Sequence, residues 1–134
     1  MTKGQLKAQG KRTRTRAIGA EDKEQRRAAI VAAAHALVHR NPSATFSVEA
    51  LARRAGLAKG TLYLYFQTRE EVLLALHEQQ SHEVFDVIER ALATPVADAR
   101  SVLAAGMTYL RAHPEFYPLA GNCRGMLEIG RAHV

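Results

Sequence analysis

The chain has no tryptophan, one cysteine and four prolines among its 134 residues. The single Cys123 cannot form an intrachain disulfide, which excludes a disulfide-stabilised scaffold. No stretch approaches the roughly 18 apolar residues of a membrane span, and no apolar run follows the first positive charges. We therefore expect no membrane span and no secretory signal. Strand patterns are essentially missing too, so the expected fold class is all-α.

Acidic residues are missing from the first 20 positions, which hold six lysines and arginines. Residues 21–69 hold eight such cations and four acids, whereas residues 70–134 hold five cations and nine acids. This uneven distribution of charge favours contact of the basic first half of the chain with nucleic acid. Residues 1–20 lack apolar periodicity, so we predict a disordered basic arm that follows a DNA backbone or enters a minor groove. A solubilising tail is the alternative.

Residues 47–69 hold two short helical patterns separated by a glycine. Ser47 is suited to cap the first helix, and its apolar stripe follows at i, i+3, i+4 and i+7: Val48, Leu51, Ala52 and Ala55. Gly56 can adopt a positive φ that ends this helix. In the second helix, predicted from about 58 to 66, Leu62 and Phe66 face inward. Such a pair of helices indicates a helix-turn-helix that places the second helix in a major groove.

The run AGLAKGTLYLYF at residues 55–66, followed by Arg69 and Glu70, resembles the signature of the TetR family of bacterial transcriptional regulators. The resemblance implies a three-helix DNA-binding domain over residues 21–68. It implies that base edges are contacted by Lys59, Gly60, Thr61 and Leu64, and backbone phosphates by Ser47, Tyr63, Tyr65 and Arg69. Gly60 is a poor helix former, by roughly 1 kcal/mol against alanine, so we expect it to allow close approach to a ligand. Ala58 departs from the family, which often has a serine or threonine cap there.

Residues 69–128 are predicted to be the start of a helical effector-binding and dimerisation domain. Helices are expected from Glu70 to about Thr94 and from about Val96 to Ala112, with a further segment opened by Pro114. The resemblance implies a complete protein that binds a near-palindromic operator in double-stranded DNA as a homodimer. It also implies a repressor released by a small-molecule effector, in the cytoplasm of a bacterium and associated with its nucleoid. No cofactor is implied.

The last six residues, 129–134, have a different possible origin. IGRAHV can be back-translated to ATCGGAAGAGCACACGTC, the start of a short-read sequencing adapter in which a TGA stop codon follows. We therefore expect these residues to be non-native and the natural protein to be longer. An ordinary helix end is the alternative.

Other functions remain open at this point. A family member that organises the chromosome would bind many scattered sites, and a helical interaction protein would not bind DNA at all. Enzymatic function is not expected, because no glycine-rich phosphate loop or nucleophile motif is present. His35 and His39 have the i, i+4 spacing of metal ligands, but the sequence shows no third ligand, so neither a metal site nor a catalytic site is predicted.

Overall fold

The computed structural model describes the backbone of residues 3–42 and 45–132, and the side chains of residues 19–42, 45–126 and 128. Six helices follow one another in this part of the chain: α1 Lys3–Arg40, α2 Val48–Ala55, α3 Lys59–Tyr63, α4 Arg69–Leu92, α5 Ala99–Ala112 and α6 Phe116–Ala132. No strand occurs within these ranges, which confirms the all-α prediction. None of the described helices combines the length and apolar character needed to cross a bilayer.

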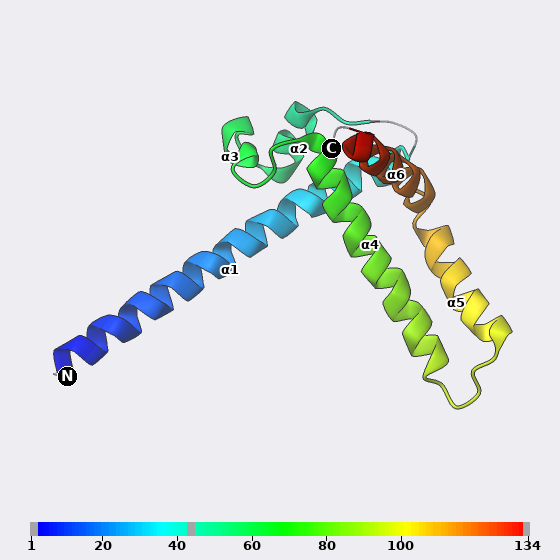
Figure 1. Cartoon of the computed structure of the whole chain (residues 1–134), viewed down its shortest axis with the longest axis horizontal. Helices are drawn as coiled ribbons and strands as arrows, with labels where there is room; N and C mark the ends of the chain where they lie inside the picture. Colours follow the sequence, from blue (N-terminus) through cyan, green and yellow to red (C-terminus); the bar gives the residue numbers. More distant parts are fainter. Residues whose placement is uncertain (1–2, 43–44, 133–134) are drawn as a thin grey trace.

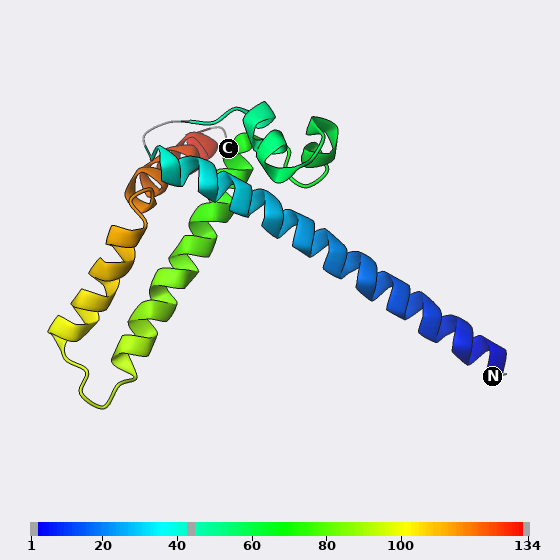
Figure 2. The same ribbon diagram turned by 180° about the vertical axis from the view of Figure 1, so that it is seen from behind.

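The helices form a head and a hairpin. The head consists of residues 21–76, with α2, α3, the adjoining part of α1 and the first turns of α4. The hairpin consists of the rest of α4 with α5, which lie side by side (Figures 1 and 2). The loop of the hairpin lies at the end of the molecule opposite α2 and α3 (Figure 1). α6 returns from α5 to the head and packs on α4.

One apolar core fills the head and continues to α6. From α1 come Ile30, Val31, Ala33, Ala34 and Val38; from the loop and the helix-turn-helix Phe46, Leu51, Ala52, Leu62 and Phe66; from α4 Val72, Leu73 and Leu76; and from α6 Leu119 and Cys123. The stripe predicted for residues 48–55 therefore faces this core, as do Leu62 and Phe66. Arg27 covers the outer edge, with its guanidinium 5.0 Å from the centre of the Phe66 ring.

The basic N-terminal segment differs from the prediction of a disordered arm, because α1 begins at Lys3. Residues 3–20 contain no proline and are rich in the good helix formers Lys, Arg, Gln and Ala. The later turns of α1 provide a nucleus, so extending the helix is easier than starting one. The side chains of residues 1–18 lie outside the described residues, so groove contact by this segment stays a prediction. The side chains of the suspected non-native tail, residues 129–134, lie outside them too.

The later helices lie close to their predicted positions but have shorter ends. α4 ends at Leu92, three residues before Pro95, since a residue that precedes proline is disfavoured in the helical conformation. α5 begins at Ala99 rather than about Val96, because Asp98 and Ser101 form a reciprocal capping box there. These caps fix where the hairpin turns.

Candidate nucleic-acid interface

The turn between α2 and α3 is built on Gly56. This residue has a φ of 68°, where a side chain is disfavoured, and its N–H points to the carbonyls of Ala52 and Arg53. Leu57 follows and packs against the core. At the other end of α2, the Ser47 hydroxyl accepts from the Ala50 N–H at 3.1 Å. Both predicted ends of α2 are therefore confirmed.

α3 presents one face to the core and the other to solvent. Leu62 is 2% exposed, whereas Tyr63 is 43% and Leu64 is 83% exposed. Lys59 and Gly60 are exposed as well, and Thr61 is half-buried. α3 is shorter than the predicted second helix, but Phe66 N–H still donates to the Leu62 carbonyl at 3.1 Å and stays in the core. Leu64 thus leaves a large apolar side chain on the solvent side, next to the exposed Lys59 and Gly60.

Gly60 has no neighbour within 4 Å of the place where a Cβ atom would stand. Packing within the chain therefore does not require a glycine here. Its φ is not in the left-handed region either, so backbone geometry gives no other reason. Close approach of another molecule to the bare backbone at Gly60 therefore stays an expectation.

Lys59 at the start of α3 pairs with Glu49 in the first turn of α2. Their hydrogen bond, together with their mutual attraction, lowers the pKa of Glu49 and raises the pKa of Lys59. Both side chains are about half exposed, so the pair adds little to stability. Glu49 instead competes with any anion that approaches Lys59. Sequence patterns did not indicate this pair beyond the charges of its members.

Three of the residues predicted to contact phosphates line one open hollow of about 260 Å³. Ser47 enters from the start of α2, Tyr63 from the end of α3 and Arg69 from the start of α4. Gln67 and Thr68 also line the hollow, although sequence patterns did not single them out. Thr68 caps α4 by accepting from the Glu71 N–H at 3.2 Å. The fold thus collects hydroxyl and cationic groups from three helices at one place on the surface, together with the Glu70 carboxylate.

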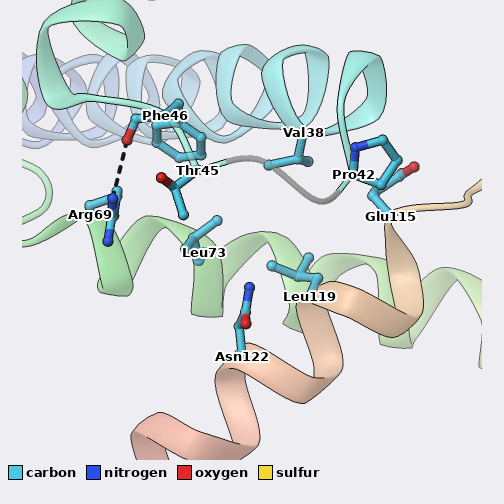
Figure 3. A pocket seen from close by; sticks show the side chains of 9 residues that line it. All are labelled: Val38, Pro42, Thr45, Phe46, Arg69, Leu73, Glu115, Leu119 and Asn122. Atoms are coloured by element: carbon cyan, nitrogen blue, oxygen red, sulfur yellow. Dashed lines mark hydrogen bonds between the residues drawn. The ribbon is translucent and has the colours of Figure 1, made fainter.

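Arg69 and Tyr65 are more engaged with the protein than the rest of the predicted set. Arg69 Nη1 donates to the Phe46 carbonyl at 3.4 Å, and Nη2 donates to Glu70 Oε1 at 3.0 Å. Figure 3 shows Arg69 reaching Phe46 at the edge of a small cavity of about 20 Å³ between α1, α4 and α6. Tyr65 is half-buried and packs against the core. Arg69 therefore supports the loop before α2 as well as lining the hollow.

Comparison with known proteins identifies the same segment. Residues 30–76 match the profile of the bacterial regulatory proteins of the tetR family. The HTH-type transcriptional regulator EthR of Mycolicibacterium smegmatis is 32% identical over 84 residues, which is 63% of this chain and 39% of that protein. EthR of Mycobacterium tuberculosis is 37% identical over 75 residues, 56% of this chain and 34% of the relative.

A further relative is the fatty acid metabolism regulator protein of Bacillus subtilis, 32% identical over 60 residues, 45% of this chain and 31% of that protein. The chain thus spans between three and four tenths of the curated relatives it matches. The segment that matches the family profile, residues 30–76, contains α2 and α3 with the adjoining parts of α1 and α4, and so includes the exposed face of α3. Residues 30–76 thus match the profile of the bacterial regulatory proteins of the tetR family, and the relatives found are regulators of the helix-turn-helix type.

Proposed function

We propose that the chain is the DNA-binding part of a bacterial transcriptional regulator and that α3 enters a major groove. The observation on which this rests is the outer face of α3, where the bare Gly60 backbone and the 83% exposed Leu64 lie beside Lys59 and Thr61. Small and polar groups on a short exposed helix fit against base edges. The hollow lined by Ser47, Tyr63 and Arg69 supplies donors for phosphates on either side of the groove.

We further propose that the complete protein is a repressor that binds its operator as a homodimer and is released by a small molecule. Support comes from the family and from an open apolar hollow of about 680 Å³ between α4 and α5. Val84 and Ile88 line it from α4, and Val102 and Met107 from α5. Such a surface suits an apolar effector. A regulator of this kind acts in the bacterial cytoplasm on the nucleoid.

The test is DNA binding by fluorescence anisotropy, with the region upstream of the protein's own gene compared with random duplex DNA. Tyr63→Phe should weaken binding to both DNAs similarly, because it removes a phosphate contact. Thr61→Ala should change the preference between them. Tyr117→Phe on α6 is the matched control for Tyr63→Phe. Tyr117 is also exposed but does not line the hollow formed by Ser47, Tyr63 and Arg69.

The outcomes separate the alternatives. Salt-dependent binding that responds to the α3 variants and not to the control supports the proposal. Equal losses for both α3 variants on both DNAs would contradict the division into base and phosphate contacts. If no salt-dependent binding is seen, the chain is a helical interaction protein instead. Binding at many scattered genomic sites would favour a role in chromosome organisation over control of one operator.

A further inference from the structure

A buried carboxylate joins α1, α4 and the start of α6. Glu115 is 1% exposed and precedes α6 directly. Its Oε1 lies 2.8 Å from His35 Nε2, and its Oε2 lies 2.9 Å from His39 Nδ1. Gln80 Nε2 on α4 donates to Oε1 at 2.7 Å. Figure 3 shows Glu115 at the N-terminal end of α6, close to Pro42 where α1 has ended. The sequence could not suggest this group, since Glu115 lies 76 residues or more from the two histidines.

The three side chains have the arrangement of a metal site. His35 and His39 lie one turn apart on the same side of α1, and one ligand atom from each residue lies within 4.8 Å of those from the other two. Zinc at about 2.0–2.1 Å from its ligands places tetrahedral ligand atoms about 3.4 Å apart. The two imidazole nitrogens now lie at 2.8 and 2.9 Å from the carboxylate oxygens. Because the two nitrogens face different oxygens and the three ligand atoms lie within 4.8 Å of one another, shifts of about an ångström would admit the ion.

The surroundings allow that movement and give the ion a route of entry. The side chain of His39 is 49% and that of His35 is 33% exposed, so both rings can adjust on the solvent side of the buried carboxylate. Gln80 can keep its bond to Glu115 and so orient the carboxylate, as partners of metal ligands commonly do. The Oε1 atom of Gln80 is buried without a hydrogen-bond partner among the described residues. That amide oxygen is a free acceptor at the site.

The donor set indicates which ion fits. Two neutral imidazoles and one carboxylate suit zinc, cobalt, nickel or copper, whereas magnesium and calcium prefer oxygen ligands throughout. Three protein ligands leave a position for water. His113 Nδ1 is 3.3 Å from Glu115 Oε1, but its ring stacks on Tyr109 with centroids 4.2 Å apart. It therefore flanks the site from α5 without belonging to the triad.

We propose that His35, His39 and Glu115 bind one divalent transition-metal ion of the zinc class and thereby fasten α1 of the head to the start of α6. The site is separate from the outer face of α3 and from the hollow between α4 and α5. It does not depend on the DNA-binding proposal, because its ligands are not among the residues proposed to contact DNA. Neutral imidazoles and an ionised carboxylate are the forms that bind the ion.

The experiment uses the full chain without an affinity tag, freed of metal and titrated with Co²⁺, whose visible absorption reports nitrogen and oxygen coordination. We expect one equivalent to bind and Zn²⁺ to displace it. His39→Ala and, separately, His35→Ala should each weaken binding at least about tenfold, since even changes to the partners of ligands cost 10–100-fold. His82→Ala is the matched control: His82 is exposed on α4, outside the triad, and its loss should leave binding unchanged.

His39→Ala is the deciding variant because this side chain is half-exposed and Glu115 keeps its bonds to His35 and Gln80 without it. Circular dichroism of each variant checks that the helices are retained. Zn²⁺ should also raise the melting temperature of the wild type and of His82→Ala, but not that of His39→Ala. Absence of Co²⁺ binding, or equal binding by the wild type and both α1 variants, would overturn the proposal. The cluster would then be a hydrogen-bonded link between helices and nothing more.

Discussion

The head and the hairpin of this molecule both carry apolar helix faces, but these faces are packed to very different degrees. In the head, Leu51 and Leu62 are at most 2% exposed, whereas no residue of α5 is buried and Leu103 is 67% exposed. Buried apolar area is the main source of stability. The head therefore holds most of the stabilising core, whereas the hairpin leaves much of its apolar surface exposed.

In the hairpin, a hydrogen-bonded contact between α4 and α5 partly compensates for the smaller buried core. The Tyr109 hydroxyl on α5 donates to Glu83 Oε2 at 2.8 Å and lies 3.2 Å from the Gln80 carbonyl, both on α4. Burial raises the pKa of Tyr109, and its bond to the Glu83 carboxylate raises it further. The two helices of the hairpin are thus joined by a specific hydrogen-bonded contact beside an open apolar hollow.

The largest effect is expected from truncating a leucine in each region. Leu51→Ala should lower the free energy of unfolding by about 2–5 kcal/mol, because it leaves a cavity in the closed core. Leu103→Ala, the matched change in the hairpin, should alter it by less than about 0.5 kcal/mol. Urea denaturation followed by circular dichroism measures both. Similar losses for the two variants would mean that α5 is packed in solution.

A smaller effect should follow from removing the hydroxyl that joins α5 to α4. Tyr109→Phe should cost about 1–2 kcal/mol, since it deletes a hydrogen bond to a partly exposed carboxylate. Tyr117→Phe serves as the control because Tyr117 is 66% exposed. The same denaturation curves test the prediction. If Tyr109→Phe behaves like its control, the hairpin is held by its apolar contacts alone.

Charged substitutions at exposed positions should show which of the two regions causes self-association, without changing the fold. Leu103→Glu should reduce oligomer formation at a given concentration, because it places a charge in the exposed apolar surface of α5. Leu64→Glu makes the same change on α3, at an 83% exposed position of the head. Light scattering over a concentration series compares the two. An equal reduction by Leu64→Glu would show that association does not depend on the hairpin.

The smallest effect is expected at the ion pair of the head. Glu49→Gln should leave the unfolding midpoint nearly unchanged, since the pair is solvated. It should strengthen DNA binding modestly, because removing the negative charge frees Lys59 for its predicted contact with base edges. A salt titration of DNA binding checks this. Weaker binding would indicate that Glu49 positions Lys59 rather than competing for it.

The sequence predicted the features that depend on near neighbours. Ser47 and Gly56 end α2 as expected because caps and turns are decided within a few residues. The apolar stripe that ends at Ala55 also faces the core, because the spacing of apolar residues along a helix indicates its buried side. The run at residues 55–66 predicted the match to the tetR profile for the same reason, because its residues are consecutive in the chain.

The features that sequence reasoning missed join distant residues or extend a helix. Glu49 and Lys59 meet only because Gly56 turns the chain between them. Glu115 meets His35 only after α4, α5 and the start of α6 are in place. The first turns of α1 contradict a prediction made from local composition, because the later turns provide the nucleus for them. The predicted contacts of α3 with DNA stay predictions.

The continuous helix α4 belongs to both regions, and amide hydrogen exchange should reveal the boundary inside it. Its first turns are covered by the core at Val72 and Leu76, so their amides should exchange only when the whole head unfolds. Beyond Glu83 the helix is covered mainly by α5, and its last turn ends in solvent at the 59% exposed Leu92. Those amides should exchange through local opening from the loop. One unbroken helix would then show two protection regimes along its length.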